Sequence, residues 1–200
     1  MNPLNIFWLF AAPSKGWSQL MQSKPSIHQL YMLHVIPLSL IPPLMVYLAG
    51  SQYDGQVLPV LPASKLLLVG AIFFLFELVV VPAMAVLVRQ LAEVAEIRPS
   101  YREAFILAAV APTPLWLAPV FLLVPSVMIN VAVVSLAMMA AAGMIFYGIP
   151  VVFEIKEKGH AILMFGALLI AGVVAWAFLM VCALLIWSSV QNLNFEMLPL

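Results

Sequence analysis

The side chain with the clearest chemical potential is Glu77, which lies in the middle of a long apolar segment. It is the twelfth of the twenty-three residues between Lys65 and Arg89. A charged group at the centre of a bilayer costs about 2.5–3.5 kcal/mol on insertion scales, and intramembrane carboxyl groups often mark proton or ion pathways. Two hypotheses follow: a proton or cation site, or a neutral acid whose hydrogen bond holds helices together.

Three hydroxyl groups are candidate partners for this carboxyl group, because they lie at a similar depth in their own apolar segments. They belong to Ser39, Thr113 and Ser135. Glu77 and these three residues form the candidate intramembrane polar site that the sequence predicts. In the structural hypothesis, the acid is bonded to one of these hydroxyls or to a backbone carbonyl that a proline has freed.

Metal binding and catalysis find little support in the residue types. His28 and His34 are six residues apart, which does not place them on one helical face. Cys182 is the only cysteine, so an intramolecular disulfide and a cysteine metal cluster are excluded. The chain has no Walker loop, no His-Glu-x-x-His, no Gly-x-Ser-x-Gly and no dinucleotide-binding glycine pattern. We therefore predict no catalytic, cofactor-binding or metal-binding residues, no cofactor and no enzyme activity.

Prolines are the second unusual feature of the apolar segments. Each proline removes a backbone donor and frees the carbonyl four residues earlier, and lipid offers that carbonyl no partner. Thr113 can fold its hydroxyl back onto a carbonyl one turn earlier. The third apolar segment is expected to be either a kinked packing helix or a ligand-facing break, as in transporters with discontinuous helices. The prolines inside the predicted spans are Pro37, Pro42, Pro43, Pro82, Pro112, Pro114 and Pro119, of which Pro112, Pro114 and Pro119 are the candidate helix breaks.

The composition indicates that these residues lie in a membrane. Of the 200 residues, 66% are hydrophobic and only 8% are charged, against about 25% charged in a typical soluble domain. Sixteen charged side chains cannot cover the surface of a soluble domain of this size. The bilayer is therefore expected to be the solvent.

Five apolar segments are long enough to cross a bilayer. Residues 66–88 would form roughly 35 Å of helix at about 1.5 Å per residue, enough for a hydrocarbon core of about 30 Å. Residues 104–153 carry no formal charge, and Val124-Pro125-Ser126 divides them into two spans. Ser100-Tyr101-Arg102-Glu103 fits a capping box, which predicts where the third helix begins. The predicted fold is an all-α integral membrane bundle with spans near 30–49, 66–88, 104–123, 127–149 and 162–187.

The distribution of basic residues predicts the orientation of the bundle, because cytoplasmic loops are enriched in Lys and Arg. Seven basic residues fall on the side of the N-terminus, and only Lys65 falls on the other side. We predict a cytoplasmic interfacial segment over 1–28, a membrane domain over 29–190 and an outer C-terminal tail over 191–200. The seven are Lys15, Lys24, Arg89, Arg98, Arg102, Lys156 and Lys158.

The segment before the first span has the periodicity of a helix. Trp17, Leu20 and Met21 share one face, and polar residues such as Lys15 take the other. With Trp8 and Trp17 at the depth of the lipid headgroups, this pattern predicts an interfacial helix.

The cytoplasmic loops, "RQLAEVAEIRPSYR" and "FEIKEKGH", contain charges spaced four residues apart. Arg89 with Glu93, and Glu154 with Lys158, have the spacing of ion pairs that extend helices. The alternative is a docking surface for a partner or for anionic lipid headgroups.

The predicted partners follow from composition and from one small-residue stripe. The lipid bilayer is the first partner, and eight basic and eight acidic residues leave no net charge that would favour nucleic acid. Ala167, Ala171 and Ala175 allow close helix approach, either within the chain or in a homo-oligomer. A different membrane protein is a further alternative partner.

Four stretches together give the chain a family likeness: "WLFAAPSKGWSQL", "APTPLWL", "VPSV" and "FYGIPVVFEIKEKG". In their order and spacing, the chain resembles the small bacterial inner-membrane branch of the Yip (Ypt-interacting protein) family. The resemblance implies five membrane helices and a cytoplasmic N-terminus. Eukaryotic relatives organise early secretory membranes and bind small Rab-type GTPases and one another. Only about 28 residues precede the first span here, so GTPase binding does not carry over.

Two functions are consistent with these patterns. The leading hypothesis is a non-enzymatic, multipass protein of the bacterial inner membrane, which organises membrane or binds partners through helix packing and short cytoplasmic loops. The alternative is a small transporter or channel-like protein that uses Glu77 and the kinked third span.

Overall fold

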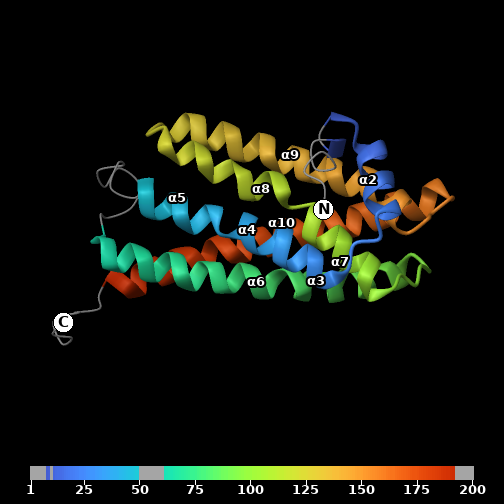
Figure 1. Ribbon diagram of the computed structural model, residues 1–200, viewed down its shortest axis with the longest axis horizontal. Helices are drawn as coiled ribbons and strands as arrows, with labels where there is room; N and C mark the ends of the chain where they lie inside the picture. The colour runs from blue at the N-terminus through green and yellow to red at the C-terminus, as the bar shows by residue number, and fades with distance from the viewer. Residues whose placement is uncertain (1–7, 10, 50–60, 192–200) are drawn as a thin grey trace.

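The structure, a computed structural model, describes residues 8–9, 11–49 and 61–191, and in these residues it contains helices and no strand (Figure 1). Five helical segments are long and apolar enough to cross a membrane. The predicted all-α membrane fold with five spans is therefore confirmed. The predicted outer tail falls, apart from its first residue, outside the described residues. The five segments are Ile27–Ala49, Ala63–Glu93, Tyr101–Leu123, Val127–Val152 and Lys158–Gln191.

The second and fifth helices are longer than the sequence predicted. The helix α6 (Ala63–Val94) contains both Lys65 and Arg89, between which the sequence predicts the span. Long basic side chains can extend toward water while their stems stay on apolar surface, so a charge at the end of an apolar run does not end the helix. In the same way α10 (Lys158–Gln191) extends beyond 162–187 at both ends.

The first span is built from four short pieces. It starts with α3 (Ile27–Leu30), continues through a π-helical turn (Tyr31–Val35) and α4 (Ile36–Ser39), and ends with α5 (Ile41–Ala49). In the π turn, the Ile36 N–H donates to the Tyr31 carbonyl five residues earlier. Such wide turns occur mostly as single bulges, frequently at functional sites. This one ends two residues before Pro37.

The third span is interrupted at residues 111–112. It begins with α7 (Tyr101–Val110), and both hydrogen bonds of the predicted capping box between Ser100 and Glu103 are present. After the interruption come α8 (Thr113–Leu117) and a 3₁₀ segment (Ala118–Leu123). The helix α9 (Val127–Val152) then starts behind the Ser126 cap, and residues 124–126 separate it from the 3₁₀ segment.

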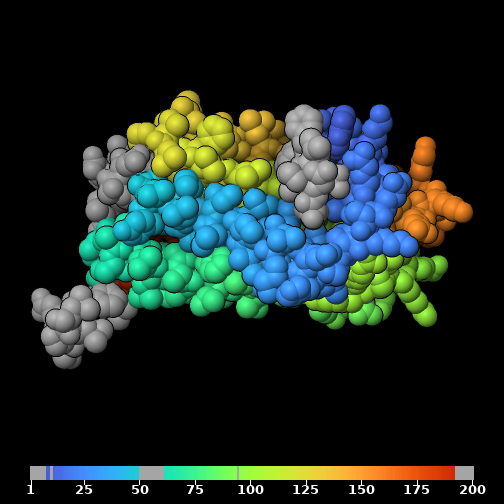
Figure 2. Space-filling model, in the orientation of Figure 1, coloured from blue at the N-terminus to red at the C-terminus, as the bar shows by residue number. Residues whose placement is uncertain are grey.

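The spans pack around α7, which is buried along most of its length. In Figure 1 the first span and α10 lie along α6, and α9 lies against α8. Figure 2 shows the outer surface of the first span running along α6. The most apolar stretch of α10 has no buried residue, which fits a helix with a broad lipid-facing surface.

The N-terminal helix α2 (Pro13–Gln22) packs against α9. Trp17 and Leu20 are fully buried, whereas Trp8 is 40% exposed. The close approach depends on Gly148, where a Cβ atom would lie 2.8 Å from two ring atoms of Trp17. Trp17 is therefore covered by protein, and its predicted position at the depth of the lipid headgroups stays a prediction. Because a tryptophan buries a large apolar area, a fitted protein surface competes well with lipid.

The helices α6 and α9 end in the same way, at the end of the bundle where α2 lies (Figure 1). The Ile97 N–H donates to the Ala92 carbonyl (2.9 Å), and the Ile155 N–H donates to the Pro150 carbonyl (3.1 Å). These are Schellman motifs. In the second motif, Glu154 is the residue that follows the C-cap of α9, and it adopts the left-handed conformation, with φ of 51°.

The helix ends correct the two predicted ion pairs. Glu154 lies beyond the end of α9, and Lys158 begins α10, so the two share no helix. Arg89 and Glu93 share α6 but form no ion pair, because both are exposed, where a pair gains little. Within the described ranges, the acid–base contact present joins His160 Nδ1 to a Glu157 carboxylate oxygen at 3.1 Å, and it becomes an ion pair when the histidine is protonated.

Candidate functional site

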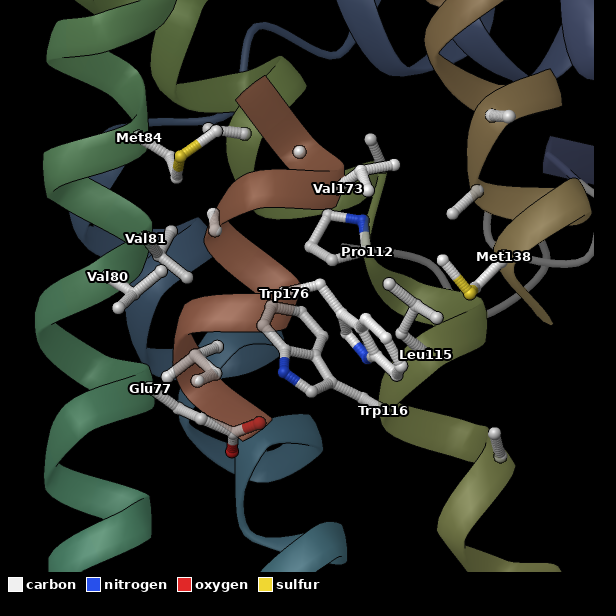
Figure 3. Close-up of a pocket in the computed structure, with 18 of the residues that line it drawn as sticks. Glu77, Val80, Val81, Met84, Pro112, Leu115, Trp116, Met138, Val173 and Trp176 are labelled. Atoms are coloured by element: carbon white, nitrogen blue, oxygen red, sulfur yellow. The ribbon is translucent and has the colours of Figure 1, made fainter. Parts of the chain in front are cut away.

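Glu77 lies inside the bundle and is only 6% exposed. Its hydrogen-bond partner is Trp116 of α8, whose indole nitrogen faces the carboxyl group (Figure 3). An indole N–H can only donate, so the carboxyl group is the acceptor. The second carboxyl oxygen, Oε2, is buried and has no hydrogen-bond partner among the described residues.

A second buried polar pair joins the first and third spans. The Thr113 hydroxyl donates to the Val110 carbonyl (2.6 Å), and His34 Nε2 lies 3.0 Å from the same hydroxyl oxygen. Because the hydroxyl has one hydrogen, which Val110 receives, His34 must donate from Nε2. The His34 ring also meets Trp116 edge-on, with ring centroids 6.2 Å apart. Trp116 therefore contacts both His34 and Glu77.

Two hydrogen bonds satisfy carbonyls that prolines have freed. Pro114 frees the carbonyl of Val110, which Thr113 takes up. Pro82 lies within α6 and frees the carbonyl of Leu78, which accepts from the Tyr31 hydroxyl at 2.8 Å. Side chains next to the break or on a neighbouring span thus replace the bonds that lipid could not supply.

The structure separates the residues of the predicted polar site. Ser39 is fully buried, but its hydroxyl donates to the carbonyl of Ile36 in its own turn (3.3 Å). Ser135 is exposed on α9 and donates to the carbonyl of Val131 (2.8 Å). Thr113 is buried beside His34. The structure gives none of the three hydroxyls a hydrogen bond to Glu77.

Two central residues of the site, Trp116 and His34, were missed from the sequence. The sequence-based prediction paired Glu77 with hydroxyl groups at a similar depth in the membrane. It left out the indole N–H of Trp116, which is an equally suitable donor. Trp116 follows Thr113 by three residues, a helical spacing that could have placed it on the same face. The inward position of His34 depends on the π turn, for which the sequence carries no periodic signal.

A cavity of about 310 Å³ lies beside Glu77 and Trp116. It is lined by all five spans and reaches the interruption of the third span at Pro112 (Figure 3). Its walls are mostly aliphatic, and the indole of Trp176 of α10 faces it. Small-molecule pockets have this character: an apolar lining with a few polar groups that fix orientation.

The residue types around the cavity define the chemistry that it can perform. The described part of the chain contains no group of three or more His, Cys, Asp or Glu side chains that could hold a metal ion. A single carboxyl group with an indole donor can bind a complementary group or exchange a proton.

Taken together, the fold and the site define a multipass α-helical membrane protein with a proline-interrupted third span and a buried carboxyl group next to an apolar cavity. Residues 8–179 match the Yip1 domain family. The chain therefore belongs to the Yip1 domain family, which confirms the predicted resemblance at the level of the family, while the bacterial inner-membrane branch stays a prediction. No match was found among curated proteins or among solved structures.

Proposed function

We propose that this Yip1-family protein is a non-enzymatic protein of the bacterial inner membrane that binds a membrane partner through the loops at one end of its bundle. The observation that supports the proposal is the collection of charged side chains at that end. The end comprises α2, the loop between α6 and α7, and the loop between α9 and α10 (Figure 1).

Two basic side chains at this end are in a position to engage a partner. Arg98 and Lys156 are exposed in the two loops. Figure 2 shows side chains of both regions projecting from the same end of the molecule. Rim charges of this kind steer association and set partner choice. The helix ends behind the loops are anchored, because Ile97 and Ile155 of the two Schellman motifs are partly buried and pack against the core.

Site-specific photocrosslinking in intact membranes tests this proposal. A photoreactive residue at Arg98 or Lys156 should give discrete protein adducts, whereas one at Val174, which is 61% exposed in the middle of α10, should give lipid adducts. Charge reversal of the residue without the probe should weaken the protein adducts severalfold. Adducts of equal strength at all three positions, or none at the loops, would refute loop-mediated binding.

A small transporter or channel-like protein is the second candidate, and the cavity beside the interrupted third span favours it. Discontinuous helices at bilayer depth are common where transporters bind substrates. Proteoliposome flux against a panel of ions and amines tests this candidate. Flux that depends on the protein and disappears in Glu77→Gln would support it, and the absence of flux across the panel would contradict it.

A further inference from the structure

We propose that the cavity beside Glu77 binds an amphiphilic organic amine in its ammonium form, with the Glu77 carboxylate as counter-ion and the Trp116 and Trp176 indoles against the ligand. This inference concerns binding alone. It goes beyond the loop-mediated function and holds whether or not the ligand crosses the membrane.

The first argument is the unsatisfied oxygen of Glu77. Buried polar atoms nearly always have a hydrogen-bond partner, so each exception needs an explanation. One oxygen of this carboxyl group has the Trp116 indole to accept from, while Oε2 has no partner among the described residues and less than a tenth of the residue is exposed. Oε2 itself is closed to solvent, but Glu77 lines the cavity, so a ligand N–H group there would supply the missing donor once the carboxyl group turns toward it.

The second argument is the character of the walls. Two indoles, those of Trp116 and Trp176, line the cavity, and aromatic faces attract organic cations, with tryptophan the strongest. Three methionines, Met84, Met138 and Met180, also line it, and their flexible thioethers adapt to apolar groups of varied shape. The remaining walls are largely aliphatic. The site therefore fits a positive nitrogen on an apolar body.

The third argument excludes other ligand classes. A metal ion would need several ligands, and the described residues offer one carboxyl group here without a cluster. An anion would be repelled by Glu77 when ionised, and a purely apolar ligand would leave Oε2 unsatisfied. An amine can arrive from lipid in its neutral form. The carboxylic O–H bond then breaks as a new N–H bond forms, which leaves an ammonium–carboxylate pair with no net charge.

The test uses the full chain in phosphatidylglycerol nanodiscs and two probes of nearly equal shape, 4-phenylbutylamine and 4-phenylbutan-1-ol. The amine should bind saturably and the alcohol at least tenfold more weakly. Glu77→Gln should lower the amine affinity at least tenfold with little effect on the alcohol. A charge-assisted hydrogen bond contributes more than the roughly 1.4 kcal/mol that corresponds to a tenfold change. Glu93→Gln, an exposed carboxyl on the same helix, is the matched control.

A second variant blocks the cavity without touching the carboxyl group. Gly172 of α10 lines the cavity, and a Cβ atom there would meet nothing within 4 Å. Gly172→Leu should therefore fold normally and lose amine binding. Gly166→Leu is its control, because Gly166 also has open space around it but lies outside the cavity.

Adding phosphatidylethanolamine to the nanodiscs identifies the source of the amine. Glu77 lies near the middle of its span, so we expect the lipid headgroup not to compete with 4-phenylbutylamine. Competition between phosphatidylethanolamine and 4-phenylbutylamine would show that the ligand of this ammonium site is a lipid amine. Each of three results would overturn the proposal: no saturable amine binding, equal affinity for the alcohol, or unchanged amine affinity in folded Glu77→Gln or in folded Gly172→Leu.

Discussion

At the scale of single residues, polar contacts between spans replace the water that is missing from the bilayer. Glu77 with Trp116 joins the second and third spans, and His34 with Thr113 joins the first and third. Each pair is buried, so removing one member leaves the other without a partner. That cost is larger than the net contribution of the hydrogen bond itself.

Glu77→Leu should lower the free energy of unfolding by about 1–3 kcal/mol, because the Trp116 N–H would then be buried without an acceptor. Glu77→Gln keeps an acceptor oxygen and should change it by less than about 1 kcal/mol. Denaturation in mixed detergent micelles, followed by circular dichroism, measures both values. In a Trp116→Phe background the cost of Glu77→Leu should shrink, and an unchanged cost would show that the indole is not the partner that matters.

Thr113→Val should destabilise the bundle by about 2–4 kcal/mol, because two groups lose their partner at once. The freed carbonyl of Val110 and the Nε2 donor of His34 both depend on this hydroxyl. Thr113→Ser should restore most of the stability. The matched control is Ser135→Ala, which removes an exposed hydroxyl and should change stability by less than about 0.5 kcal/mol. Equal effects of Thr113→Val and Ser135→Ala on thermal unfolding would contradict this prediction.

The sequence predicted the presence of buried polar residues better than their pairing. The isolated carboxyl group of Glu77 is visible because a charged residue type interrupts an apolar run. Its partner depends on the rotation of α8 after the interruption at 111–112, and the position of His34 depends on the extra residue in the π turn. Such local changes in helical phase redirect side chains without changing the hydrophobic pattern.

At the scale of helices, close packing depends on a few positions that lack a side chain. Gly148 lets the Trp17 ring lie against the α9 backbone, and this contact attaches α2 to the membrane bundle. The apolar face of α2 was predictable from its periodicity. Its docking surface was not, because a glycine in an apolar helix gives no indication of which residue will cover it.

Gly148→Ala should lower thermal stability and loosen α2, because the added methyl would approach the Trp17 ring at 2.8 Å. A loss of about 1–3 kcal/mol is expected from such overpacking. Gly143→Ala, in the same helix with open space around it, should be neutral or slightly stabilising, since alanine favours helix. Limited proteolysis within α2 and thermal unfolding measure both effects. Faster cleavage in Gly143→Ala than in Gly148→Ala would contradict the assignment.

At the scale of the whole molecule, the basic loops lie at one end of the bundle. Reporter fusions after residue 98 and after residue 156 should be cytoplasmic, and a fusion after Gln191 should lie on the opposite side. The physical reason is the retention of Lys and Arg on the cytoplasmic side during insertion. Seven basic residues against one make this asymmetry large. A cytoplasmic reporter after Gln191 would require an even number of spans and would contradict the five-span arrangement.

The position of α10 also has a consequence for biogenesis. This helix is the last of the five spans to leave the ribosome, and it supplies Trp176 and one wall of the cavity around Glu77. Until it inserts, the four earlier spans lack the wall of this cavity that α10 supplies. The pocket beside Glu77 is therefore completed only when the last span docks.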